Sequence, residues 1–425
     1  MTTRVRALFA VVALLPATIW LAGCDHYVCK TTFGNASCSS SGSGLGGVGG
    51  TGTSSAFVYA VDQGTTGATT GTIDGFALDA TAVTFGPISG YTAPTVPLNS
   101  FGTGMVVAHD LYLYTAFGST NQIFGWTISS SGNLTAITGS PFSVTAAGGD
   151  IGGVGQANMI TNPAGTLLFI SDAIRTSIAV YSIGSGGVLG SVGSFSCPSG
   201  FTPMNLTTDG LGKYLYAVDG SNAIHQGTQI AAFSISAAGT LTPVVGSPFV
   251  FPMWQLKGEP SGQFLIGTTG TTVPYNGRDD DNLYVFRITQ TGSNAGALTQ
   301  VTKQSTQNSP FSIAVQSQAG GALVYSFGFN DTATGFNPIE GFSISSSGGL
   351  TAVSGSPFSL GEGQWGQFDQ SGGLLFGYAS FLNASTNTIV TQISPVSVGS
   401  GGLLTQPAST LTIATPGFWA VADTP

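Results

Sequence analysis

An internal repeat of short strands constrains the fold of this chain more than any other feature. A short apolar run that ends in a turn or an acidic residue recurs seven times: FVYAVD (57–62), YLYTAF (112–117), LLFISD (167–172), YLYAVD (214–219), FLIGTT (264–269), LVYSFG (323–328) and LLFGYA (374–379). The third residues of successive runs are 47 to 59 positions apart. A repeat near fifty residues that is built of short strands is typical of the blades of a β-propeller.

Each repeat has the same internal order. A second strand with alternating apolar residues follows the first, as in QIFGWTIS (122–129), and a Gly-rich turn leads to a third strand that begins with Leu, as in LTAITGSPF (134–142). A fourth strand precedes the first and joins it through a tight turn such as DGLG (209–212). The period of two residues indicates half-buried strands rather than helices. In sheet order we name these strands a, b, c and d.

The two ends of the chain share one repeat. The first repeat begins at its b strand, residues 57–62, and the chain ends with TPGFWAVAD (415–423), which matches an a strand with no b strand after it. A closed ring leaves no sheet edge exposed, which accounts for such a split. The sequence therefore predicts an all-β, seven-bladed propeller of four-stranded antiparallel blades, in which the C-terminal strand completes the first blade.

Composition supports this prediction and excludes other classes. The chain has 64 Gly among 425 residues and only 6% charged residues, against about 25% in an average soluble domain. A helical bundle is excluded because strong helix formers are scarce, whereas 42% hydrophobic residues and a mean hydropathy of +0.31 indicate a buried core. With a net charge of −9 and nine basic residues, we expect no nucleic-acid partner. We expect a monomer.

The N-terminal segment has the features of a secretion signal. Arg4 and Arg6 precede an apolar stretch over 8–20, and Leu21-Ala22-Gly23-Cys24 resembles the lipobox of bacterial lipoproteins. The resemblance implies a signal peptide over 1–23, a lipid on Cys24 and a Gly/Ser-rich tether over 24–55 that precedes the propeller at 56–425. An uncleaved anchor helix is the alternative, although the apolar run is short for a membrane span. Either way we expect an extracytoplasmic protein held at a bacterial membrane, on the periplasmic face or the cell surface, and the choice between inner and outer membrane stays open.

Three further cysteines follow the lipobox. Cys29 and Cys38 are close enough in sequence to form a disulfide in an oxidising compartment, although the spacing does not identify the pairing. Cys197 is then left without a partner, and we expect it to be buried and unreactive.

The repeated motifs resemble a known family. The LYVaD-like b strand, the DPSG-like a–b turn and the GSPF units at 139–142, 246–249 and 355–358 resemble the lactonase-type seven-bladed propellers, a group related to 6-phosphogluconolactonase and to a fungal muconate cycloisomerase. The resemblance covers nearly all of 56–423 and implies the fold more securely than the activity. Members often have a Pro-His pair where strand a enters the central funnel. Here Met204 follows Pro203, and the equivalent positions hold Ala157, Trp254, Ile313, Gln364 and Phe418.

These departures bear on the substrate. With no His at the funnel positions and few cations in the chain, a phosphorylated sugar lactone is a poor candidate. The funnel is predicted to be aromatic and amide-lined, and its candidate ligand-binding residues are Trp254, Trp365, Met204, Gln364 and Phe418. For Trp254 and Trp365, stacking on a sugar ring and packing between blades are both open.

The b–c loops of the third to fifth blades hold the catalytic candidates, because in propellers these loops share the face on which strand a enters. They contain Arg175, His225 and Arg278. His225 titrates near neutral pH and suits a general acid or base, with an ordinary exposed histidine as the alternative. Asp62, Asp172 and Asp219 each end a b strand, and this repetition predicts that they accept hydrogen bonds from loop N–H groups.

One loop contains a run of three acids, Asp279, Asp280 and Asp281. Carboxylate oxygens suit a hard cation such as Ca²⁺, but the spacing is not that of a known calcium loop, so a solvated acidic loop beside Arg278 is the alternative. No other cofactor is expected.

Two functions from different classes fit the sequence. The first is a binding module in the cell envelope that takes a glycan or a protein at the funnel. The alternative is a lactonase-like hydrolase or isomerase that acts on a neutral lactone or a sugar-acid lactone, with His225 and either Arg175 or Arg278 as participants.

Overall fold

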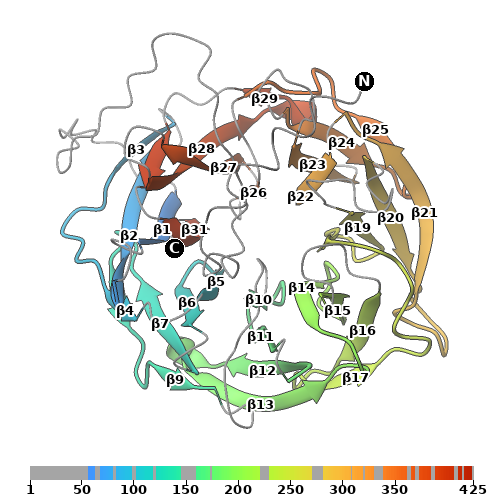
Figure 1. Ribbon diagram of the computed structural model, residues 1–425, viewed down its shortest axis with the longest axis horizontal. Helices are drawn as coiled ribbons and strands as arrows, with labels where there is room; N and C mark the ends of the chain where they lie inside the picture. The colour runs from blue at the N-terminus through green and yellow to red at the C-terminus, as the bar shows by residue number, and fades with distance from the viewer. Residues whose placement is uncertain are drawn as a thin grey trace, which may run out of the picture.

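The computed structural model describes residues 56–423 except for 63–67, 80–82, 98–101, 118–120, 145–158, 173–174, 221–228, 270–280, 308, 319–320, 330–337, 361–364, 369–372, 384–387, 406–409 and 414–415. The predicted signal peptide and tether, with Cys24, Cys29 and Cys38, lie outside the described residues. Seven sheets form a ring around a central axis (Figure 1). Among the described residues, no helix is long and apolar enough to cross a membrane.

The first four blades follow the predicted strand order, from the innermost strand a outward to strand d. Blade 1 contains β31 (Pro416–Asp423), β1 (Ala56–Asp62), β2 (Thr70–Asp79) and β3 (Thr84–Pro87), with β4 (Thr95–Pro97) also on β2. Blade 2 contains β5 (Gly102–Ala108), β6 (Tyr112–Phe117), β7 (Gln122–Ile128), β8 (Leu134–Ala136) and β9 (Phe142–Ser143). Blade 3 contains β10 (Met159–Thr161), β11 (Leu167–Asp172), β12 (Ser177–Ile183) and β13 (Leu189–Ser196), and blade 4 contains β14 (Pro203–Thr208), β15 (Tyr214–Asp219), β16 (Ile230–Ile235) and β17 (Leu241–Pro243).

The last three blades repeat this order. Blade 5 contains β18 (Gln255–Gly258), β19 (Phe264–Thr268), β20 (Asn282–Ile288) and β21 (Leu298–Ser305). Blade 6 contains β22 (Ser309–Gln318), β23 (Gly321–Phe329), β24 (Glu340–Ile344) and β25 (Leu350–Ala352). Blade 7 contains β26 (Trp365–Phe368), β27 (Leu374–Asn383), β28 (Thr388–Val398), β29 (Leu404–Thr405) and β30 (Leu411–Ile413). The only helical turns in the described part are η3 (Ser185–Gly187) and η4 (Ser400–Gly402).

The predicted closure of the ring is confirmed. β31 pairs antiparallel with β1, and the register places Ala56 opposite Asp423 and Tyr59 opposite Ala420. The last strand of the chain is therefore the innermost strand of the first blade, so the seven-bladed, four-stranded prediction holds as a whole.

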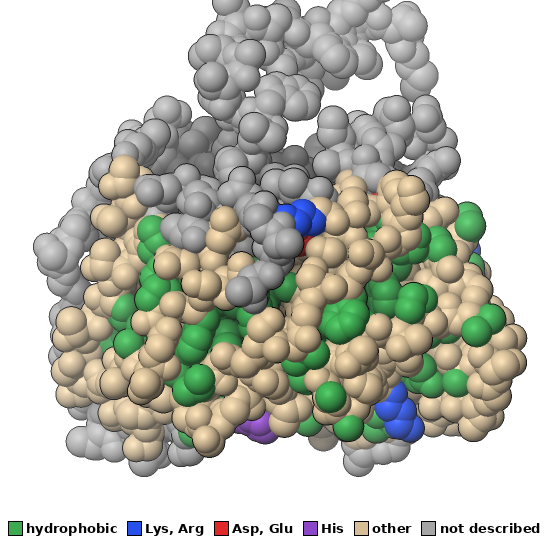
Figure 2. Space-filling model, turned by 90° about the horizontal axis from the view of Figure 1, so that it is seen from below, with side chains coloured by type: hydrophobic (Ala, Val, Ile, Leu, Met, Phe, Trp, Pro, Cys, Tyr) green, Lys and Arg blue, Asp and Glu red, His purple; other side chains and the backbone are tan. Residues whose placement is uncertain are grey.

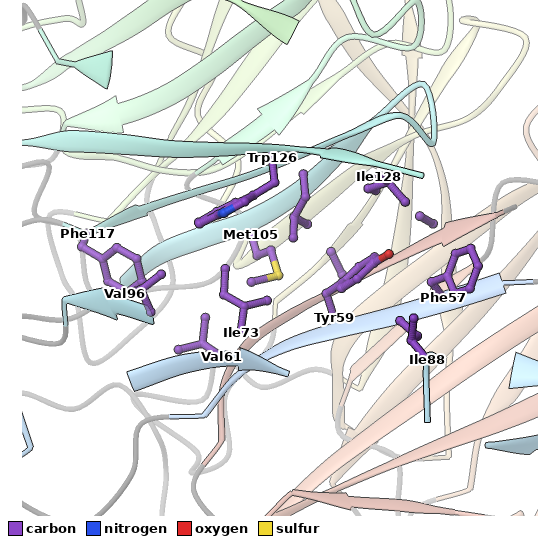
Figure 3. Packing of buried hydrophobic residues seen from close by; sticks show 13 residues of the cluster. Phe57, Tyr59, Val61, Ile73, Ile88, Val96, Met105, Phe117, Trp126 and Ile128 are labelled. Carbon is purple, nitrogen blue, oxygen red and sulfur yellow. The ribbon is translucent and has the colours of Figure 1, made fainter. Parts of the chain in front are cut away.

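The core lies between the blades rather than within one central cluster. Alternate residues of β1 pack on opposite neighbours: Phe57 and Tyr59 face blade 2, whereas Ala56 and Val58 face blade 7. Figure 3 shows the first of these contacts, where Tyr59 and Ile73 meet Met105 and Trp126. The described residues form seven such apolar clusters, one for each pair of adjacent blades. This arrangement follows from the two-residue period of a strand, which gives each sheet two apolar faces.

The GSPF units have a structural role. In each of them the serine hydroxyl accepts a hydrogen bond from an N–H of strand c, for example from Ala232 to Ser247 at 2.9 Å. The phenylalanine that follows pairs with strand c again, as Phe249 does with Ile230. Ser140 and Ser356 make the same bond to Gly125 and Gly341. The motif thus ends strand d early without leaving the strand c N–H group unpaired.

Candidate functional site

The innermost strands of blades 4, 5 and 6 begin at the funnel mouth with equivalent residues. Thr207 pairs with Tyr216, and Ala314 pairs with Tyr325 at the matching place in blade 6. Met204 lies three residues before Thr207, and Phe311 lies three residues before Ala314, so the two correspond. In blade 5 the matching residue is Lys257, which pairs with Ile266, and Trp254 lies three residues before it.

This register corrects one sequence expectation. The blade 6 position at the funnel is Phe311 and not Ile313, which is fully buried between blades 5 and 6. Phe311 lies at a bulge between Pro310 and Ser312, and blade 4 has a bulge at the matching place, between Met204 and Leu206. The signal that could have identified it is the Pro310-Phe311 pair, which matches Pro203-Met204.

Trp254 and Phe311 form an aromatic pair at the funnel mouth. Their ring centroids are 5.2 Å apart, and the ring planes make an angle of 39°. Phe311 is buried, whereas Trp254 keeps part of its surface exposed. The Trp254 backbone is held on both sides, because its N–H donates to the Thr268 carbonyl at 2.7 Å and its carbonyl accepts from Asn205 Nδ2 at 2.7 Å. A fixed, partly exposed indole offers an apolar face on which a sugar ring can stack.

Buried amide side chains connect the inner strands near this pair. Asn205 on β14 donates to β18, and the N–H of Ile313 on β22 donates to Gln255 Oε1 on β18 at 2.7 Å. Both amides are buried, and their bonds join the inner strands of blades 4, 5 and 6.

The other predicted funnel residues have varied surroundings. Met204 is buried and packs against Gly220, where an added Cβ would lie 1.9 Å from its Sδ. The backbones of Trp365 and Phe418 belong to β26 and β31, and their side chains lie outside the described part, as does Gln364.

Of the catalytic candidates, Arg175 lies within the described residues, and His225 and Arg278 lie outside them. Arg175 Nη1 forms an ion pair with Asp172 Oδ2 at 2.6 Å, and its N–H donates to Asp172 Oδ1 at 2.9 Å. Asp172 is 1% exposed and Arg175 19%. The guanidinium is thus held at the end of β11 by a buried carboxylate, with part of its surface left accessible.

The predicted role of the aspartates that end strand b is confirmed for two of them. Asp172 accepts the Arg175 N–H, and Asp219 Oδ1 accepts the N–H of Thr202 at 3.0 Å. Both are buried, and each satisfies a loop N–H group at the funnel end of its strand.

Asp281 is the one member of the acidic run within the described part. Its Oδ1 accepts a hydrogen bond from the Ser309 hydroxyl at 2.7 Å, and its carbonyl accepts from the Thr306 N–H at 2.7 Å. The Ser309 bond links the start of strand c of blade 5 to strand a of blade 6, and the Thr306 bond joins the two outer strands of blade 5. No group of three or more His, Cys, Asp or Glu side chains among the described residues is arranged to hold a metal ion; Asp279 and Asp280 lie outside them.

Two polar groups, one buried and one partly exposed, were not expected from the sequence. Glu340 is 5% exposed and its Oε2 accepts the Gln307 N–H at 2.8 Å. Lys257 lies on β18, three residues below Trp254, where burial lowers the pKa of its ammonium group. A signal for Lys257 was available, because it is the only lysine or arginine in any strand a of the described residues.

Cys197 is buried and free, as expected, and packs in the apolar cluster between blades 3 and 4. Burial raises the pKa of its thiol to about 12, so the nucleophilic thiolate is disfavoured.

Comparison with known proteins identifies relatives of the fold. No family model matches the chain, and no curated protein matches it. Among solved structures, a protein of Bacteroides fragilis assigned as a 6-phosphogluconolactonase is 16% identical with a TM-score of 0.60, over 87% of this chain and 98% of that one. One of Bacteroides uniformis with the same assignment is 15% identical with a TM-score of 0.60, over 87% and 99%. The periplasmic gluconolactonase of Pseudomonas aeruginosa is 15% identical with a TM-score of 0.58, over 87% and 100%.

Proposed function

From the fold that this chain shares with the 6-phosphogluconolactonase-like seven-bladed propellers, we propose that it hydrolyses the lactone of a neutral sugar acid. The observation that carries the proposal is the match to propellers assigned to sugar lactones over 87% of the chain. The partly exposed Trp254 beside Phe311 supports it, because an aromatic face at the funnel mouth suits a sugar ring.

The charges of the described part favour an unphosphorylated substrate. Arg175 is paired with Asp172, Arg287 donates to the Ser347 carbonyl and lies over the Phe264 ring, and Lys303 lies over the Tyr284 ring. Figure 2 shows one side of the ring, where charged side chains are few and scattered. A phosphate group is recognised best by several converging cations, and the described residues present no such group.

The proposed hydrolysis passes through an oxyanion and includes a proton transfer. Water attacks the lactone carbonyl carbon, the ring C–O bond breaks, the ring oxygen takes up a proton, and a carboxylate and a hydroxyl form. In this scheme His225 accepts the proton of the attacking water, and Arg175 or Arg278 stabilises the oxyanion. Trp254 orients the ring. Asp279, Asp280 and Asp281 form the proposed Ca²⁺ site, which would polarise the carbonyl oxygen.

We further propose that the reaction takes place outside the cytoplasm. The leader that ends at Cys24 supports a lipid-anchored protein, and the similar propeller of Pseudomonas aeruginosa is periplasmic. The membrane, reached through the lipid, is then the partner of the N-terminus.

A second candidate function is a glycan-binding module with no turnover. The aromatic pair at the funnel mouth favours it, because stacking alone is sufficient for binding a sugar.

Hydrolysis measured as proton release at constant pH tests the proposal. We expect the purified protein to hydrolyse gluconolactone faster than its 6-phosphate, and His225→Ala to lower kcat/KM about a hundredfold or more. His109→Ala is the matched control, since His109 lies at the a–b turn on the opposite face and contacts Gly165. Loss of rate with a chelator would support the Ca²⁺ site. Folded protein that shows no turnover above the spontaneous rate but retains sugar binding would overturn the hydrolase in favour of the binding module.

A further inference from the structure

Lys257 is the single charge at its level of the inner wall. It pairs with Ile266 on β19, and the registers of the other blades place one residue of each inner strand at the same level: Ala420, Val106, Ile160, Thr207, Ala314 and Gln367. All six are uncharged. Lys257 is therefore the only charged side chain among these seven register positions.

Lys257 keeps part of its surface accessible on the innermost strand of blade 5. Lys257, Val106 and Ile160 are partly exposed and Gln367 is exposed, whereas Thr207 and Ala314 are buried. These residues belong to the innermost strands of their blades, which Figure 1 shows around the central axis. We call the exposed residues Val106, Ile160, Lys257 and Gln367 the axial surface.

Neighbouring strands prevent the lysine from turning toward blade 4. An added Cβ at Gly258 would lie 2.1 Å from the Thr208 carbonyl oxygen, and the Gly258 N–H donates to Thr207 Oγ1 at 3.2 Å. β14 and β18 are thus in direct contact beside Lys257. Gln255, two residues earlier on the same face of β18, points to blade 6 and accepts the Ile313 N–H. Because residues two positions apart share a face of a strand, the Lys257 side chain also leaves β18 toward blade 6.

Within the described part of the chain, the Lys257 ammonium group has no counter-ion. Among the described residues no carboxylate lies within ion-pair distance of it, and the acids at the ends of the two strands are occupied in their own turns. Glu259 accepts the Ser261 N–H at 2.9 Å, and Asp209 accepts the N–H groups of Lys213 and Tyr214, each at 2.7 Å. Burial without a partner disfavours the charged form, in agreement with the lowered pKa of Lys257.

We propose that the axial surface binds a small organic carboxylate whose charge pairs with the Lys257 ammonium. An anion placed there would offset the cost of a desolvated, unpaired cation. One cation matches one carboxylate charge, whereas a phosphate monoester carries about two charges and prefers several cations. The choice of probe rests on the proposed function, because hydrolysis of a sugar lactone releases a sugar acid; gluconate is that probe.

Calorimetric titration with gluconate tests the proposal. We expect binding to the full protein and a dissociation constant about tenfold larger or more for Lys257→Met. Lys257→Gln, which keeps a polar group without the charge, should show the same loss. Lys213→Met is the matched control, because Lys213 is exposed at the turn that follows β14, and it should bind as the unchanged protein does. Sorbitol, which has the same carbon chain without a carboxylate, should not compete.

A second readout reports on the lysine itself. The lysines are labelled by reductive methylation with ¹³C-formaldehyde, and the NMR signal of Lys257 is the one that disappears in Lys257→Met. When this signal is followed through a pH titration, gluconate should raise the pKa of Lys257. An unchanged pKa with saturating gluconate, equal gluconate affinity in Lys257→Met, or competition by sorbitol would overturn the proposal. The two proposals can fail separately. If the protein hydrolyses the lactone but binds gluconate equally well without Lys257, only the carboxylate site is wrong. If gluconate binding depends on Lys257 but no lactone is hydrolysed, only the proposed hydrolase function is wrong.

Discussion

Two equivalent turns of blades 3 and 4 have an amide, Asn162, and a carboxylate, Asp209, at the same position. Asp209 Oδ1 accepts the N–H groups of Lys213 and Tyr214, each at 2.7 Å, and Asn162 Oδ1 accepts those of Thr166 and Leu167, each at 2.9 Å. The amide of Asn162 and the carboxylate of Asp209 thus accept equivalent backbone hydrogen bonds in equivalent turns. Asp209 is 1% exposed, and its desolvation raises the pKa of the carboxyl group despite the bonds from the turn.

We therefore expect Asp209→Asn to keep the turn and to remove the pH-dependent loss of folding stability that comes from ionising a buried carboxyl group. Because the pKa of Asp209 is higher in the folded than in the unfolded chain, the native protein loses stability from this group as pH rises through the folded pKa. The variant lacks that loss. We expect its free energy of unfolding to equal or exceed that of the native protein at about pH 7, with the difference vanishing at about pH 3, below both pKa values.

Urea unfolding at the two pH values measures this effect. Asp209→Ala serves as the comparison, since it removes the acceptor of both N–H groups and should lower stability by about 1–3 kcal/mol at either pH. A variant Asp209→Asn that is less stable than the native protein at about pH 7 would contradict the expectation.

At the scale of elements, tyrosines of strand b fasten one blade to the next. The hydroxyls of Tyr59, Tyr114, Tyr216 and Tyr325 donate to the carbonyls of Gly132, Gly187, Gly296 and Gly402, at 2.7, 2.6, 3.0 and 2.6 Å. Each glycine lies in the c–d turn of the following blade and has a positive φ, 91° at Gly296. Blades 3, 5 and 7 have Phe169, Ile266 and Phe376 at this position and lack the bond. The interfaces of one ring are thus held in two ways, by apolar packing throughout and by an added hydrogen bond in four cases.

Tyr216→Phe should remove one such tie without changing the packing. The Gly296 carbonyl is then left without its donor in a buried interface, and we expect a loss of about 1–2 kcal/mol in the free energy of unfolding. Tyr214→Phe is the matched control, because the Tyr214 ring packs beside Gly296 and its loss should stay below about 0.5 kcal/mol. Equal losses in the two variants, measured by urea unfolding, would argue against the hydrogen bond as the fastening.

At the scale of the whole molecule, stability depends on the pairing of the two chain ends. β31 supplies the inner strand of blade 1, where Ala420 and Ala422 are buried against blades 1 and 2, and Val421 packs toward blade 7. The Asp423 N–H also donates to Asp110 Oδ1 in the a–b turn of blade 2, at 3.0 Å. The last eight residues in the described part therefore connect three blades.

A chain that ends at residue 413 should lose the native fold. β1 would become an exposed edge and two apolar clusters would open, a loss comparable with the whole stability of a domain, about 5–15 kcal/mol. A chain that ends at residue 423 is the control, because it keeps β31. Circular dichroism melting and light scattering should show a low, broad transition and aggregation only for the shorter chain. A native-like melting temperature for that chain would show that the ring does not need its closing strand.

Local patterns predicted much of the fold and part of the site. The apolar alternation, the turn residues and the split repeat fixed the blade number and the closing strand, because they depend on neighbours along the chain. The structural use of Asp172 and Asp219 was predictable for the same reason, since the same acid recurs at the same end of strand b. Phe311 was missed although Pro310-Phe311 matches Pro203-Met204, because apolar residues at both 311 and 313 fit the two-residue period of a strand.

The sequence by itself determined that this chain forms a ring of seven antiparallel sheets closed by its own C-terminal strand. Only the tertiary structure decided which side chains meet across the blades. The tyrosine ties join residues 73 to 80 positions apart, and the Trp254–Phe311 pair joins the inner edges of two blades. Among the described residues no carboxylate pairs with Lys257, and Glu259 and Asp209 bind their own turns. Strand period is a property of consecutive residues, whereas pairing and charge compensation are properties of residues brought together in space.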